Sequence, residues 1–161
     1  MTSASKYLAT YLTDHYAGST AGVSLARRAA SENEGNELGA FLSQLSEEIA
    51  ADRETLKEIM DALDVHADPV KVAAARGMEL VARLKPNGQL VGSSPLSPLV
   101  ELESLKLGIE GKLALWRSLG EIGDGPPLDP ERMAELAARA ERQAADVEAR
   151  RLGVGREALA T

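Results

Sequence analysis

A histidine stands where a helix is expected to turn an apolar face inward. His15 lies in the stretch YLTDHYAG, residues 11–18, and follows Leu8 and Leu12. Apolar and small residues recur along this segment at alternating steps of four and three, which is the spacing of one helix face. An imidazole near neutral pH is a general acid or base and a common metal ligand. His15 is therefore the first candidate functional residue.

An aspartate interrupts a second apolar line in the same way. Asp52 falls between Ile49 and Leu56, and Glu48 precedes it by one helical turn. A short break joins this segment to the first one, so His15 and Asp52 are expected to lie level with each other on neighbouring helices. A carboxylate without a partner is strongly disfavoured inside a protein. We therefore expect Asp52 to be paired.

Glutamates on two later segments extend this set. Glu103 and Glu110 share one helix face, and the turn that follows brings Glu110 level with Glu141 and Glu103 level with Glu148. Carboxylates combined with an imidazole suit iron or manganese, and the interiors of helical bundles hold such ions. The candidate metal ligands are His15, Glu48, Asp52, Glu103, Glu110 and Glu141.

The same residues fit a buried polar network that holds no metal. A hydrogen bond or ion pair to Asp52 from His15, Tyr11, Arg117 or Arg142 satisfies the carboxylate without any ion. We favour this interpretation, which requires no cofactor, and keep iron or manganese as the alternative. The sequence assigns no catalytic residue.

Helices separated by short breaks are expected to position these side chains. Capping residues mark where they begin: Asn36 after Gly35, and the pairs Asp68–Pro69, Ser97–Pro98 and Asp129–Pro130. The predicted helices cover residues 5–31, 36–63, 69–84, 98–121 and 130–152.

The predicted fold class is all-α, with two helical hairpins joined by a long connection that carries the short helix 69–84. A bundle with one long crossover is the ferritin-like four-helix arrangement, in which the second and third main helices run the same way. An up-down-up-down bundle with a fifth helix on its side is the alternative. We expect one domain over residues 1–161.

Composition excludes several classes of function. The chain is 44% hydrophobic but only 3% aromatic, which favours packed helices over strands. A net charge of -7 argues against nucleic-acid binding, and the lack of cysteine removes thiolate chemistry and disulfides. No apolar run approaches about 20 residues and the N-terminus does not resemble a signal peptide, so we expect a cytoplasmic protein without membrane contact.

Two stretches carry a resemblance to a known superfamily. YLTDHYAGSTAGVSLARR and LGAFLSQLSEEIAADRETLKEIM are similar to the first two helices of bacterial ferritin-like four-helix-bundle proteins to which no reaction is assigned. The resemblance implies a ferritin-like bundle over most of the chain. Di-iron members of the superfamily carry Glu-x-x-His pairs, whereas Leu12 and Leu63 precede the two histidines, His15 and His66, at that spacing.

Two functions therefore stay open. The first is a non-catalytic bundle whose buried polar residues fix helix register and which acts through self-association or a protein partner. Gly18 and Gly22, one turn apart, allow close approach of another backbone, either inside one subunit or at a dimer interface. The second is a bundle that binds iron or manganese at the interior cluster, with redox or storage activity. Trp116 is expected in the core and His66 at the surface.

Overall fold

The described part of the chain is entirely helical. The computed structural model describes residues 5–67, 94 and 96–160, which form four α-helices and no β-strand. The helices are α1 (Lys6–Glu32), α2 (Glu37–Ala62), α4 (Ser97–Ile122) and α5 (Pro130–Leu159). The all-α prediction is confirmed for these residues, whereas the predicted helix 69–84 lies outside them. None of the four helices has the length and apolar character needed to span a membrane.

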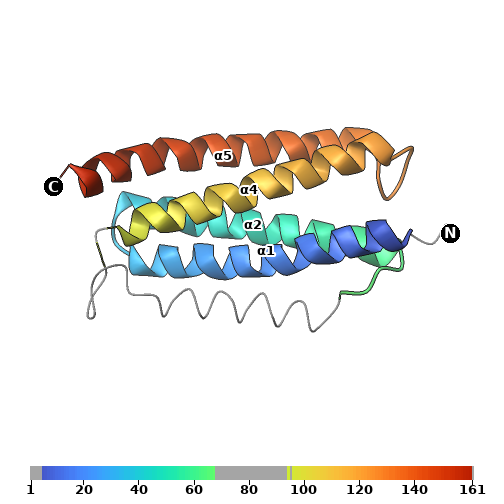
Figure 1. Cartoon of the computed structure of the whole chain (residues 1–161), viewed down its shortest axis with the longest axis horizontal. Helices are drawn as coiled ribbons and strands as arrows, with labels where there is room; N and C mark the ends of the chain where they lie inside the picture. Colours follow the sequence, from blue (N-terminus) through green and yellow to red (C-terminus); the bar gives the residue numbers. More distant parts are fainter. Residues whose placement is uncertain (1–4, 68–93, 95, 161) are drawn as a thin grey trace.

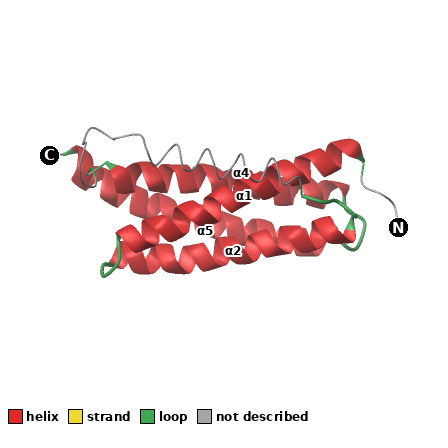
Figure 2. Ribbon diagram, turned by 90° about the horizontal axis from the view of Figure 1, so that it is seen from below, coloured by secondary structure: helices red, strands yellow, loops and turns green. Residues whose placement is uncertain are grey.

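The four helices share one long axis (Figures 1 and 2). α1 and α2 run in opposite directions, as do α4 and α5, and α2 and α4 run in the same direction (Figure 1). α1 packs against both α2 and α4, and α5 packs mainly against α4. The backbones of α2 and α5 approach each other at few positions, so side chains bridge this seam.

Two helices begin at the capping residues that the sequence predicts. The side chain of Asn36 accepts a hydrogen bond of 2.9 Å from the N–H of Gly39, and Gly35 before it has a φ of +90°, a conformation that glycine adopts without strain. Asp129 accepts bonds from two N–H groups in the first turn of α5, and Pro130 is the first helical residue.

The start of α4 differs from the prediction. Ser97 is the first residue of the helix rather than its N-cap, and Leu96, which has no capping side chain, precedes it. The N–H of Ser97 donates to the carbonyl of Ser94 at 2.9 Å, so backbone turns take over the role predicted for the serine hydroxyl.

The end of α5 also differs. The helix continues to Leu159, past the glycines that were expected to end it at residue 152. Val154 packs against the core, and a Cβ added to Gly155 would lie 3.5 Å from a methyl group of Leu99 on α4. Packing against α4 therefore outweighs a glycine cost of about 1 kcal/mol per residue.

Aliphatic side chains fill most of the core, together with Tyr16, Trp116 and methionines. On α4 one apolar line is buried along its length: Leu99, Leu102, Ile109, Leu113 and Trp116. Burial of each large apolar side chain stabilises the fold by about 1.5–3 kcal/mol. The prediction that Trp116 lies in the core is confirmed, as is the exposure of His66.

The buried face of α1 includes part of the predicted line, in which Leu12, Ala26 and Ala29 are fully buried. Leu12, Tyr16 and Val23 are buried, whereas His15 and Gly22 are only half-buried. Because α1 packs against two helices, its buried face is wider than the predicted line and also includes Tyr16 and Val23.

Candidate functional site

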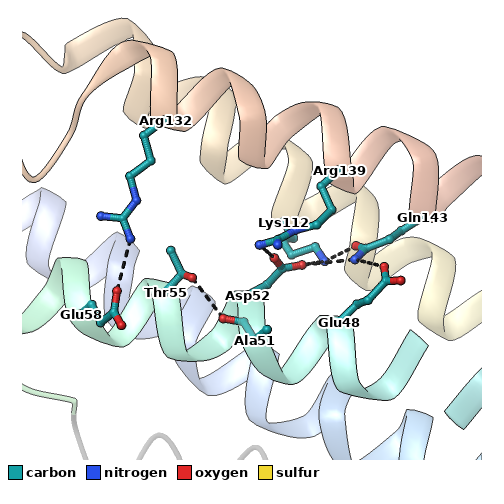
Figure 3. A network of polar contacts seen from close by, with 9 residues as sticks. All are labelled: Glu48, Ala51, Asp52, Thr55, Glu58, Lys112, Arg132, Arg139 and Gln143. Atoms are coloured by element: carbon teal, nitrogen blue, oxygen red, sulfur yellow. Dashed lines mark hydrogen bonds and ion pairs between the residues drawn. The ribbon is translucent and has the colours of Figure 1, made fainter. Parts of the chain in front are cut away.

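Asp52 is the centre of a polar cluster between α2, α4 and α5 (Figure 3). Its side chain is 2% exposed, which confirms that it points inward. One carboxylate oxygen accepts a hydrogen bond of 2.5 Å from Nζ of Lys112 on α4, and the other accepts one from the guanidinium of Arg139 on α5. Both oxygens are thus engaged by cations from two other helices.

Gln143 on α5 completes the cluster. Its carbonyl oxygen accepts from Nζ of Lys112, and its Nε2 donates to Glu48 at 2.9 Å and to Asp52 at 3.4 Å. Figure 3 shows these side chains converging from the two sides of the seam. We call this set the Asp52 cluster; its members are Glu48, Asp52, Lys112, Arg139 and Gln143.

The Asp52 cluster balances its own charge, with two carboxylates and two cations. The side chain of Lys112 is 13% exposed, and this burial lowers its pKa below the usual 10.5, against the opposing effect of Asp52. Desolvation largely offsets the attraction within a buried ion pair, but removal of one member leaves a buried charge without compensation. Any shift of α2 relative to α4 and α5 would separate these pairs and therefore raise the free energy of the folded state.

The partners of Asp52 differ from those considered in the sequence. Arg117 was one expected partner, but it pairs with Glu141 at the surface instead. The sequence nevertheless contained a signal for Lys112, which lies three residues after buried Ile109 and four before buried Trp116. A charged residue at that spacing is on the inward face of the helix.

His15 lies apart from the Asp52 cluster. Its ring packs edge-on against Tyr11, with centroids 4.6 Å apart. Burial lowers the pKa of His15 below the usual 6.5, although the charge of Asp14 acts in the opposite direction. No hydrogen bond or ion pair joins His15 to Asp52, so the expected pairing is not present. Both residues nevertheless line the same cavity, which agrees with the expectation that they lie level with each other on neighbouring helices.

Three predicted metal ligands lie in surface ion pairs. The pairs are Glu103–Arg151 (3.4 Å), Glu110–Lys106 (3.2 Å) and Glu141–Arg117 (2.5 Å). The glutamate side chains are 47–52% exposed. The rotation of α4 and α5 about their own axes turns Lys112 and Gln143 inward in place of these glutamates. The expected gathering of the six ligands in one interior does not occur. Within residues 5–67 and 96–160, no group of three or more histidine or acidic side chains is placed to hold a metal ion.

A cavity of about 500 Å³ adjoins the Asp52 cluster on the side of α1. Residues of α1, α2 and α4 line it, and we call it the α1–α4 groove. Four glycines contribute to its walls: Gly18, Gly22, Gly108 and Gly111. A Cβ built on any of them meets no described atom beyond its own helix backbone within 4 Å. The close helix contact expected at Gly18 and Gly22 is therefore absent from the described structure.

Two polar side chains of the α1–α4 groove differ in their partners. Arg53 donates to the hydroxyl of Tyr16 at 2.6 Å and to Oγ1 of Thr20 at 3.1 Å, which ties α2 to α1. Trp116 is 1% exposed, and its indole N–H has no hydrogen-bond partner among the described residues. Buried donors are nearly always paired, so this N–H has capacity for a further acceptor.

The fold and the site define an all-helical bundle with a buried ion-pair cluster and a neighbouring groove. No family model, curated protein or solved structure matches the chain.

Proposed function

We propose that this chain is a ferritin-like four-helix bundle that acts by binding and not by catalysis. The observation that carries the proposal is the pairing of Asp52: both its oxygens accept hydrogen bonds from cations, so protein groups satisfy the buried carboxylate without a metal. In this function the Asp52 cluster sets the register of three helices.

The direction of the helices supports the ferritin-like part of the proposal. α2 and α4 run the same way, and α2 ends at the opposite end of the bundle from the start of α4 (Figure 1). A single long crossover produces this order in ferritin-like folds, whereas an up-down-up-down bundle alternates throughout. The similarity of the first two helices to ferritin-like proteins points the same way.

The α1–α4 groove is the surface that we assign to binding. It combines an opening between helices with walls that are mostly apolar, and ligand sites in bundles form between helices in this way. The groove lies on the α1 side of the Asp52 cluster, so the cluster holds the helices that form its walls.

Metal analysis tests the proposal. The protein is produced without a chelating tag in medium supplemented with iron and manganese, and its metal content is measured by mass spectrometry. We expect well below one equivalent per chain, because the cations of the Asp52 cluster take the place of a metal. One equivalent or more that is lost in both Asp52→Asn and Glu48→Gln, but kept in the surface variant Glu141→Gln, would establish the alternative function of iron or manganese binding.

A further inference from the structure

We draw no further inference here: the strongest candidate, the α1–α4 groove with its glycine-lined walls, is already assigned to binding, and nothing among the described residues shows what occupies it.

Discussion

Asp52 on α2 and Arg139 on α5 are joined by a hydrogen-bonded ion pair across a seam where the backbones of the two helices approach at few positions. Further along the same seam, Glu58 and Arg132 pair at 3.2 Å (Figure 3). Ion pairs between side chains therefore connect α2 and α5 at two points along this seam. On the opposite wall of the bundle α1 packs against α4, and glycines of both helices line the cavity there.

Removal of the Asp52 charge should destabilise the fold. Asp52→Asn leaves Lys112 and Arg139 facing each other without a carboxylate between them. We expect a loss of about 3 kcal/mol, the low end of the range for breaking a buried pair, because the side chain of Arg139 keeps 32% exposure. Urea denaturation followed by circular dichroism measures the change.

The surface pair of Glu141 and Arg117 provides the control for this variant. Both side chains are more than half exposed, so Glu141→Gln should cost no more than about 1 kcal/mol. Equal effects of Asp52→Asn and Glu141→Gln would mean that the cluster does not hold the helices together.

Acidification should destabilise the wild type through His15. Burial lowers the pKa of His15 in the folded state, so the unfolded chain binds a proton near pH 6.5 before the folded chain does. The free energy of unfolding contributed by this group therefore falls as the pH drops from about 6.5 to the lowered pKa, and is constant below it. Urea titrations at about pH 7.5 and about pH 5.5 should show a smaller loss in His15→Gln than in the wild type.

His66 provides the control for this pH effect. Its side chain is 86% exposed, so His66→Gln removes an imidazole that folding does not bury. The burial argument for His15 fails if His15→Gln and His66→Gln respond alike.

Alanine in place of the groove glycines should stabilise the protein. Gly18→Ala, Gly22→Ala and Gly108→Ala each add a methyl group to open space. Each should raise the free energy of unfolding by about 0.5–1 kcal/mol, because alanine forms helix better than glycine. Thermal denaturation followed by circular dichroism measures this gain.

Gly39 is the matched control with the opposite sign. A Cβ at this buried position of α2 would collide with the carbonyl group of Asn33, so Gly39→Ala should destabilise the fold. Destabilisation by Gly22→Ala as well would show that something packs closely on α1 at that point.

Sequence patterns predicted the parts of this protein that depend on local chemistry. Helix starts at Asn36 and Asp129 follow from side chains that accept backbone N–H groups within the same turn. The burial of Asp52 follows from its place in a regular apolar line on one helix. His15 and Asp52 were expected at the same height along the bundle because a short connection joins their two long helices. Both residues line one cavity.

The partners of Asp52 were not available from such patterns. Lys112 and Arg139 are 60 and 87 residues away along the chain, on helices whose rotation about their own axes the sequence specifies only loosely. If α4 were rotated about its axis by one residue position, Gly111 would take the place of Lys112. The same rotation would change whether the glutamates of α4 point inward or outward. The predicted ligand set placed Glu103, Glu110 and Glu141 inward, whereas the structure places them at the surface.

The sequence by itself determined an all-helical chain with a buried carboxylate, because helix propensity, capping and periodicity act between residues a few positions apart. Only the tertiary structure decided that cations satisfy the carboxylate, that His15 borders a groove, and that glycines of α1 and α4 line the same cavity. These outcomes depend on the rotation of each helix against its neighbours, which is set by packing across the whole bundle.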